Sequence, residues 1–492
     1  MNLNAKSRKN DGAQAGVRPG DPPPDLAFNP TARKEEVATE LLLLRREFDA
    51  WKGRLSAGPD AAFHQTQLAR LDRVLQGAIK NIENALDNIV LAHPPDAVYA
   101  ELQLYDLRVV WLRRVWQYYR EKFEQRADPE LKDLLAAADE VVWSCYAPVF
   151  RGRPKLPLRP APLAYVESYY SPAALPVDMV PPTLADPDVG EKFLKKMLGC
   201  LPIPVVRLPP VCARAPWWLT YLAHEVGHHV QFNLAVDRGM VTEFEALIEK
   251  VAKEHGHAAD AEEWKRWSVE IFADVFSVVV IGPWAIWALL EFEFNRPDEM
   301  VRRKTYYPAP AVRLRLMEQA ARSEPLRLDP SEALRGLRLD DLAAGNKIVA
   351  WDFELVPHVV KAALDTLPGL GLTLPKLCGF RRSEFEPASG KKAIVTARAE
   401  SLLGSSVLIP ETGLRAARLA ATGALAAWSK VMRIKGDPER AARREALAAR
   451  ALALIKMSQE PGVRAATVDE AEQGGESLAR LLLGADRQQL HS

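Results

Sequence analysis

The chain has 492 residues, of which 48% are hydrophobic and 26% are charged. These proportions are ordinary for a soluble globular protein, and a chain of this length is expected to divide into two to four domains. The formal net charge is +1, which provides no overall field that would favour nucleic acid or an anionic membrane. No nucleic-acid partner is therefore predicted.

The N-terminal residues 1–30 are polar and rich in Gly, Pro, Lys and Arg, and they lack the apolar segment of a secretory signal. They are predicted to form a disordered tail, and the missing signal predicts a cytoplasmic location. The four cysteines, Cys145, Cys200, Cys212 and Cys378, contain no C-x-x-C pair. They are interpreted as reduced thiols, with a Cys200–Cys212 disulfide as the alternative.

Residues 31–145 have the pattern of an N-terminal helical bundle. Apolar side chains recur at steps of three and four residues from Val37 to Leu55 and again from Leu68 to Ile89, as in helices with one buried face. A third helix is expected over residues 99–125. An antiparallel bundle within the chain is the simplest product, and a coiled coil that binds a partner or a second copy is the alternative.

Residues 146–325 differ in composition and are predicted to form the core that carries the chemistry. Proline is dense as far as Pro216, which excludes long helices there. The segment 204–208 predicts a short strand, and the prolines beside it are typical of a sheet edge. Helices are expected over 216–236 and over 258–294, the second kinked at Gly282-Pro283.

The apolar run 275–290 is too short and too interrupted to span a membrane, so a buried core helix is predicted instead. Residues 326–492 are expected to be mostly helical, because they alternate helix-forming stretches with Gly and Pro turns. The predicted fold class is therefore mainly α with a small β element (α+β).

The segment 224–228, His-Glu-Val-Gly-His, is the strongest local signal in the chain. A spacing of four places the imidazoles of His224 and His228 on one face of a helix, where two neutral imidazoles can bind one Zn²⁺. Glu225 projects beside such a metal, where a general base can take a proton from a metal-activated water. His229 points about 100° round the helix and is expected to be a packed or solvent-facing residue.

A third protein ligand is expected on the next long helix. Glu270 and Asp274 lie one helical turn apart among apolar residues, where two carboxylates without a cation would repel each other. Glu270 is therefore assigned to the metal, and Asp274 is expected to orient His224 or His228 as a hydrogen-bond acceptor. The competing acids lie in a polar stretch that is interpreted as a solvated face: Glu243, Glu245 and Glu249.

The pattern H-E-x-x-H followed by E-x-x-x-D on a second helix resembles the gluzincin group of zinc metallopeptidases. The local sequence His-Glu-Val-Gly-His-His is most similar to that of the HtpX and CAAX-protease-like branch, and the resemblance covers residues 200–320. It implies a zincin-like core, made of an edge strand, an active-site helix and a ligand helix, flanked by helical regions. Members of that branch usually carry membrane spans, which are not predicted here.

In that branch a His-Pro-Pro segment with a downstream arginine often follows the ligand helix, and here Tyr307 stands where the histidine would be, with Arg313 downstream. Tyr307 is the best placed of three candidates for stabilising an oxyanion, the others being Tyr306 and His358, although a core tyrosine is an equal alternative. Arg313 and Arg315 are expected either to bind a substrate carboxylate or to pair with buried acids.

These residues predict a zinc metalloendopeptidase of narrow or regulated specificity that acts on a protein or peptide substrate. One Zn²⁺ per chain would be bound by His224, His228 and Glu270, with Glu225 and Tyr307 as catalytic residues. The alternative is a catalytically silent zincin-fold scaffold or sensor that binds a regulatory protein partner through its helical regions. Glu225 favours the enzyme, because a scaffold needs no base beside its metal.

Overall fold

The computed structural model describes residues 29–485 except 59–60, 154–155, 157–158, 169–172, 176–192, 194–195, 198–199, 201–202, 235–238, 388–389, 405–406, 435, 437, 461–463 and 465–469. These residues are mainly helical and contain one small sheet, which confirms the predicted class. The expected disordered tail lies outside the described residues, apart from its last two positions. There Asn29 accepts a hydrogen bond from the Ala32 amide at 3.0 Å and caps a helix that begins at Pro30.

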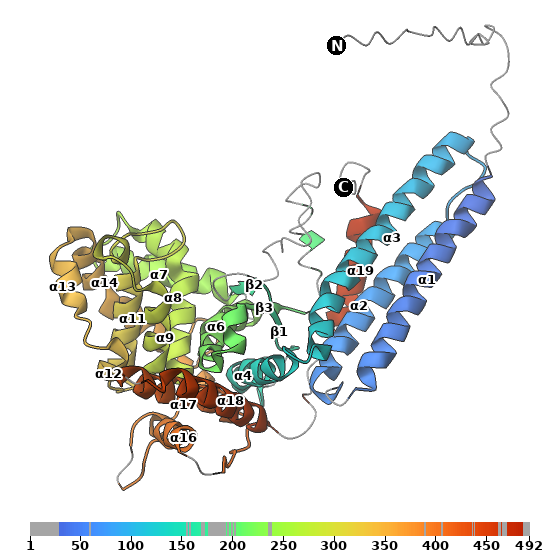
Figure 1. Cartoon of the computed structure of the whole chain (residues 1–492). Coiled ribbons are helices and arrows are strands. Elements are labelled where there is room, and N and C mark those ends of the chain that lie inside the picture. Colours follow the sequence, from blue (N-terminus) through green and yellow to red (C-terminus); the bar gives the residue numbers. More distant parts are fainter. Residues whose placement is uncertain are drawn as a thin grey trace, which may run out of the picture.

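Three long helices form a bundle on one side of the molecule (Figure 1). They are α1 (Pro30–Ser56), α2 (Ala61–Asp87) and α3 (Pro95–Glu124). The apolar stripes predicted for the first two helices are buried inside this bundle, including Val37, Trp51 and Leu71. Burial of these stripes within the chain favours the intramolecular bundle over the coiled-coil alternative.

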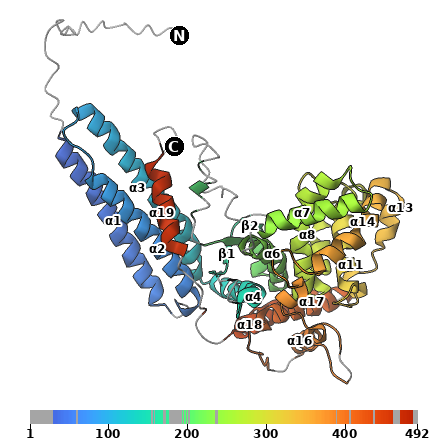
Figure 2. The same ribbon diagram turned by 180° about the vertical axis from the view of Figure 1, so that it is seen from behind.

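A helix from the far end of the chain completes the bundle. Helix α19 (Glu470–Leu483) lies along α2, as both views of the ribbon show (Figures 1 and 2). The contact is backbone to backbone: a Cβ atom on Gly475 would lie 2.9 Å from the Val74 carbonyl oxygen and 3.2 Å from the Cα of Gly77. Glycine is needed at position 475 because any side chain would separate the two helices.

A small mixed sheet and helix α4 (Lys132–Phe150) lie between the bundle and the larger helical body (Figures 1 and 2). The strands are β1 (Leu163–Val166), β2 (Ala173–Leu175) and β3 (Val205–Leu208), in the order β1-β3-β2. Strand β3 is parallel to β1 and antiparallel to β2. The expected edge position of β3 is therefore wrong: Pro204 and Pro209 flank the strand without interrupting it, so both of its sides remain able to pair.

The helices that carry the candidate site follow β3. They are the 3₁₀ helices η2 (Pro210–Ala213) and η3 (Pro216–Tyr221) and the α-helices α6 (Leu222–Asn233), α7 (Met240–Glu254), α8 (Ala261–Ile281), α9 (Trp284–Glu293), α10 (Pro297–Met300) and α11 (Pro310–Arg322). The helix expected over 216–236 thus begins as a 3₁₀ turn. The kink expected at Gly282-Pro283 is a full break, since Gly282 has φ of 67° and ends α8.

The C-terminal region is helical, as predicted, and it covers the site helices. Its elements are α12 (Ser331–Leu334), α13 (Leu339–Ala344), α14 (Lys347–Leu364), α15 (Leu374–Leu377), η4 (Arg382–Glu384), α16 (Ile394–Leu403), α17 (Ala416–Arg433) and α18 (Arg440–Met457). Within the described ranges, none of the helices combines the length and apolarity that a membrane span requires. The run 275–290 is largely buried in the protein core, as expected.

Two buried cores run across the domain boundaries proposed from the sequence. One core extends from Leu134 on α4 to Ile455 on α18, so it unites the expected segments 146–325 and 326–492 and takes in the end of 31–145. The other core joins the first three helices, β1 and α19. All four cysteines carry free thiols, so the alternative Cys200–Cys212 disulfide is not formed.

Candidate metal centre

Helices α6 and α8 cross in close contact and bring the two motif segments together. At the crossing lies Gly227, where an added Cβ would be 2.9 Å from the Cα of Ala273 and 3.1 Å from the ring of Phe276. The backbone that approaches Gly227 is therefore that of α8. Because each helix presents its motif side chains toward this crossing, the two histidines of α6 face the acids of α8.

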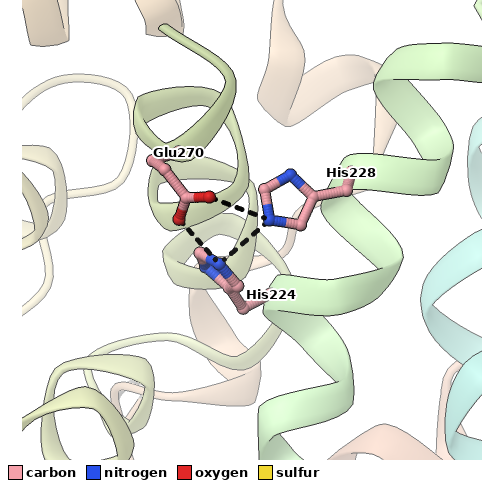
Figure 3. A group of neighbouring side chains, drawn as sticks. All are labelled: His224, His228 and Glu270. Atoms are coloured by element: carbon pink, nitrogen blue, oxygen red, sulfur yellow. Dashed lines mark hydrogen bonds and ion pairs between the residues drawn. The ribbon is translucent and has the colours of Figure 1, made fainter. Parts of the chain in front are cut away.

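Three side chains converge on one point, as Figure 3 shows. The Nε2 atoms of His224 and His228 are 3.2 Å apart. Glu270 places its Oε2 3.3 Å from Nε2 of His224 and its Oε1 3.6 Å from Nε2 of His228. One ligand atom from each residue lies within 4.8 Å of the others, so the group could hold a metal ion.

Asp274 lies behind the first histidine, as expected. Its Oδ1 is 3.0 Å from Nδ1 of His224, which leaves Nε2 of that ring directed at the centre of the cluster. Arg313 of α11 donates two hydrogen bonds to Asp274, each 2.8 Å long, and its Nη2 is 3.5 Å from Oε2 of Glu270. Of the two roles left open for Arg313, pairing with buried acids is therefore the one observed.

The charges of the cluster shift the pKa values of its members in opposite directions. Burial would lower the pKa of His224, but hydrogen bonds to Asp274 and Glu270 outweigh burial and raise this pKa to about 10. Burial lowers the pKa of His228. Burial would raise the pKa of Glu270, but the charges of His228, His224 and Arg313 bring it to about 2. Without a cation the cluster thus holds a proton on His224, which a metal ion has to displace.

Asp274 remains ionised for the same reason. Its complete burial would raise its pKa, yet the bidentate guanidinium of Arg313 and the imidazole of His224 hold the pKa well below the usual range for an aspartate. The carboxylate therefore stays an acceptor at neutral pH. An ionised acceptor at Nδ1 orients the imidazole and makes its Nε2 a stronger ligand for a metal.

A cavity of about 390 Å³ opens beside the cluster. Glu225, Lys304 and Tyr307 line this cavity together with the three candidate ligands. Tyr307 is 42% exposed, and its pKa is raised by the charge of Glu270 and by partial burial. Tyr306 and His358, the other candidates for an oxyanion donor, do not line the cavity: Tyr306 is 67% exposed and His358 stacks on His255.

The remaining polar candidates lie away from the cluster. His229 is buried, its Nε2 lies 3.2 Å from the carbonyl oxygen of Val205, and burial lowers its pKa to about 3, so it is a packed residue as expected. Glu249 of α7 pairs with Lys253 and Lys265. The acids that competed for the role of third ligand do not line the cavity, and they lie outside the group that could hold a metal.

The apolar wall of the cavity was not foreseen from the sequence. It is formed mainly by Tyr221 of η3 and by residues of α8 and α9, which are Ile281, Ala285, Ala288, Leu289 and Phe292. Tyr221 donates a hydrogen bond to the carbonyl oxygen of Ala288, which ties η3 to α9. Ile281, Ala285, Ala288 and Leu289 belong to the apolar run 275–290, and the break at Gly282 divides this run between α8 and α9.

Comparison with protein-family models, with curated proteins and with solved structures finds no match to this chain. The chemistry of the site is therefore inferred from its own residues.

Proposed function

We propose that this protein is a zinc-dependent peptidase whose metal is bound by His224, His228 and Glu270. The observation that carries the proposal is the convergence of the two imidazoles and the carboxylate. The Nε2 atoms of His224 and His228 are 3.2 Å apart, and Glu270 places Oε2 3.3 Å from the first and Oε1 3.6 Å from the second. Ligand atoms about 2.0–2.1 Å from a tetrahedral Zn²⁺ are roughly 3.3 Å apart, which matches these separations. Two imidazoles and one carboxylate are also the ligand set of catalytic zinc sites that keep a fourth position open.

The residues around the ligands support hydrolysis. When bound, zinc would supply a Lewis acid that polarises the scissile carbonyl and makes water more acidic. Glu225 follows the first ligand on α6 and lines the same cavity, where it would accept the proton of the attacking water. Glu225 would then deliver this proton to the amine of the leaving group, so that one water and one peptide bond yield a carboxylic acid and an amine.

Tyr307 is the proposed hydrogen-bond donor to the oxyanion that forms during this attack. It lines the cavity from the side of α11, and its raised pKa keeps the phenol protonated, as a donor requires. Asp274 and Arg313 also line the cavity, but each is bound to the other. Their proposed role is to fix the orientation of His224 and Glu270.

The proposed class is the gluzincin group, with a zincin-like core built from the small sheet, α6 and α8. The side chains His224, Glu225, His228, Glu270 and Asp274 occupy the positions that the H-E-x-x-H and E-x-x-x-D patterns require of that group. A cytoplasmic location and a narrow range of protein or peptide substrates belong to the same proposal, because unrestrained proteolysis would damage a cell.

The proposal is tested with the full-length protein loaded with zinc and a mixture of peptides of varied sequence. We expect about one zinc per chain by elemental analysis and cleavage products by mass spectrometry. Glu225→Gln should keep its zinc and lose activity by about 10²- to 10⁴-fold, the usual contribution of a general base. Glu249→Gln, which replaces an acid of α7 outside the cluster, is the matched control and should behave like the wild type.

Three results would contradict the proposal. A wild type that binds no zinc when zinc is supplied would remove the metal centre. A zinc-loaded wild type that cleaves no peptide would favour the scaffold or sensor instead. A Glu225→Gln variant that cleaves as fast as the wild type would show that Glu225 is not the general base.

A further inference from the structure

The rim of the cavity includes a short segment without regular secondary structure. Residues 301–309 join α10 to α11, and Lys304 and Tyr307 of this segment line the cavity. The segment is a compact turn, in which the Lys304 amide donates to the Tyr307 carbonyl at 3.0 Å. Tyr306 and Tyr307 are 67% and 42% exposed, so burial of their side chains does little to fix the turn. The position of the turn therefore depends on the contacts made by other residues of the segment 301–309.

Arg303 provides the principal anchor. Its guanidinium donates two hydrogen bonds to Asp352, from Nε at 3.0 Å and from Nη2 at 2.6 Å, and a third to Glu263 at 2.7 Å. Nη1 also donates to Asp260 at 3.3 Å. A bidentate pair fixes the orientation of a guanidinium as well as its position, because both partners are planar.

The environment of this pair is largely excluded from solvent. Asp352 is 0% exposed, and the guanidinium of Arg303 lies 5.4 Å from the ring centroid of Trp267. The indole of Trp267 in turn donates to the carbonyl oxygen of Lys304 at 3.2 Å. Trp267 precedes the candidate ligand Glu270 by three residues, so the rim segment is tied to the same helix that supplies the third ligand.

Asp352 belongs to α14, which lies in the C-terminal region outside residues 200–320. Helix α14 packs against α7 and α11, and its Trp351 donates to Asp260 at 3.0 Å. The anchor thus joins three parts of the molecule that are distant in sequence: the start of α8, the rim of the cavity and the C-terminal region.

We propose that Arg303 and Asp352 are positioning residues for the reaction. They hold residues 301–309 so that Tyr307 faces the metal cluster, and through them the C-terminal region forms part of the active site. The inference rests on the proposed peptidase function, in which Tyr307 is the donor to the oxyanion. A donor displaced by about 1 Å can cost on the order of a hundredfold in rate, so an anchor of this kind affects catalysis without touching the substrate.

Asp352→Asn is the informative substitution because it preserves the shape of the side chain. The amide can accept only one of the two hydrogen bonds, and its own N–H groups face the guanidinium. Removing Arg303 would be less informative, since it would leave Asp260, Glu263 and Asp352 to repel one another. Arg303→Lys, which keeps the charge and loses the bidentate geometry, is the second variant in case the first does not fold.

The first measurement does not require activity. Hydrogen exchange of the zinc-loaded protein, followed by mass spectrometry, should show exchange in residues 301–309 that is at least about tenfold faster in Asp352→Asn than in the wild type. The matched control is Asp340→Asn, which alters an 81% exposed aspartate paired with Arg315 on the surface. Unchanged exchange in residues 301–309 of both Asp352→Asn and Arg303→Lys would overturn the inference.

The second measurement is a double-mutant cycle with Tyr307→Phe, read as kcat and KM for a cleaved peptide. Asp352→Asn should lower kcat on the order of tenfold with little change in KM, and its effect should largely disappear in the Tyr307→Phe background. Full additivity of the two substitutions would overturn the inference even if both lower kcat. A wild type that cleaves no peptide would contradict the proposed function instead, and the hydrogen-exchange result would still decide whether Arg303 and Asp352 anchor the rim.

Discussion

Glu270 is the residue on which the metal cluster depends, because it is the one member that comes from α8. Its carboxylate faces both imidazoles of α6, at 3.3 Å from His224 and 3.6 Å from His228. It is held there by the crossing of the two helices and by Arg313, whose Nη2 is 3.5 Å away. A glutamine at position 270 would leave the two imidazoles without the carboxylate that completes the proposed ligand set.

We therefore expect Glu270→Gln to bind zinc far more weakly than the wild type. The loss should exceed the roughly 10- to 100-fold reduction in affinity that follows removal of a partner behind a ligand. Competition with a chelator of known affinity measures this change, and Glu245→Gln, which alters an acid outside the cluster, is the control. Equal zinc affinity in Glu270→Gln and the wild type would show that the third ligand lies elsewhere.

A buried histidine outside the metal cluster, His64, allows a prediction about pH. His64 belongs to α2. Its Nδ1 is 2.7 Å from Oε1 of Gln67, and its Nε2 accepts a hydrogen bond from Nε of Arg126 at 3.2 Å. Burial, together with the charge of Arg126, lowers the pKa of His64 to about 4. Protonation of Nε2 would direct its N–H at the guanidinium, so the folded protein requires the neutral ring.

The sign of the pH effect follows from the two pKa values. In the unfolded chain His64 takes up a proton below its ordinary pKa of 6.5, whereas in the folded protein it does so only near 4. The stabilisation due to neutral His64 is therefore complete above pH 6.5 and is lost as the pH falls from 6.5 to 4. Urea unfolding at several pH values should show a slope shallower by up to about 1.4 kcal/mol per pH unit in His64→Gln. Identical slopes in this interval would contradict the prediction.

At the scale of elements, the contact between α6 and α8 determines whether the ligands meet. Gly227 allows the two helices to approach within reach of the short imidazole and carboxylate side chains, because an added Cβ would lie 2.9 Å from the backbone of Ala273. The same closeness makes the crossing sensitive to volume, since a packed core cannot absorb an extra methyl group without moving.

Gly227→Ala should separate the two helices, lower the free energy of unfolding by about 1–3 kcal/mol and weaken zinc binding at the same time. Gly53→Ala is the matched control, because Gly53 is in the interior of α1 and nothing lies within 4 Å of its added Cβ. That substitution should stabilise α1 by about 0.5–1 kcal/mol, as alanine forms helix better than glycine. Chemical denaturation and zinc titration of both variants would check these expectations, and an unchanged zinc affinity in Gly227→Ala would contradict them.

The break after α8 is the other decisive feature at this scale. Gly282 has a positive φ, and an added Cβ there would lie 2.5 Å from the ring of Phe385, so the C-terminal region packs directly on the turn. The turn directs α9 along the cavity and places Leu289 and Phe292 in its wall. The shape of the apolar wall thus depends on a residue more than ninety positions away in sequence.

At the scale of the whole molecule, the two buried cores are connected by a chain that passes between them more than once. The metal cluster belongs to the larger core, while α19 belongs to the bundle. The glycine contact between α19 and α2 is specific to the bundle, and its residues lie apart from the cavity. Disturbing α19 should therefore affect one core and leave the other intact.

Gly475→Leu is predicted to displace α19 from α2 and to destabilise the bundle, while the protein retains its zinc. Limited proteolysis should release α19 faster than in the wild type. In thermal unfolding, the first transition should have a lower midpoint temperature than in the wild type. Ser477→Ala, an exposed position of the same helix, serves as the control. Loss of zinc in Gly475→Leu would show that the two cores fold as one unit.

Much of the metal cluster could be predicted from the sequence because its information is local. The spacing of His224 and His228 and that of Glu270 and Asp274 are each one helical turn, and an α-helix converts such a spacing into a shared face. The apolar neighbours of both pairs indicate burial, which acids and imidazoles tolerate only with a partner. Helical stripes such as Val37 to Trp51 are local in the same sense, and their burial follows the predicted pattern.

The helices of the N-terminal bundle with their buried faces, and the residues able to bind a metal, can therefore be read from the amino-acid sequence. The meeting of distant segments is visible only in the folded chain: Arg313 on Asp274, Arg303 on Asp352, β3 at the centre of its sheet and α19 on the N-terminal bundle. The physical reason is that helical periodicity depends on hydrogen bonds between residues four apart, whereas these contacts depend on how whole faces of the chain fill the same volume.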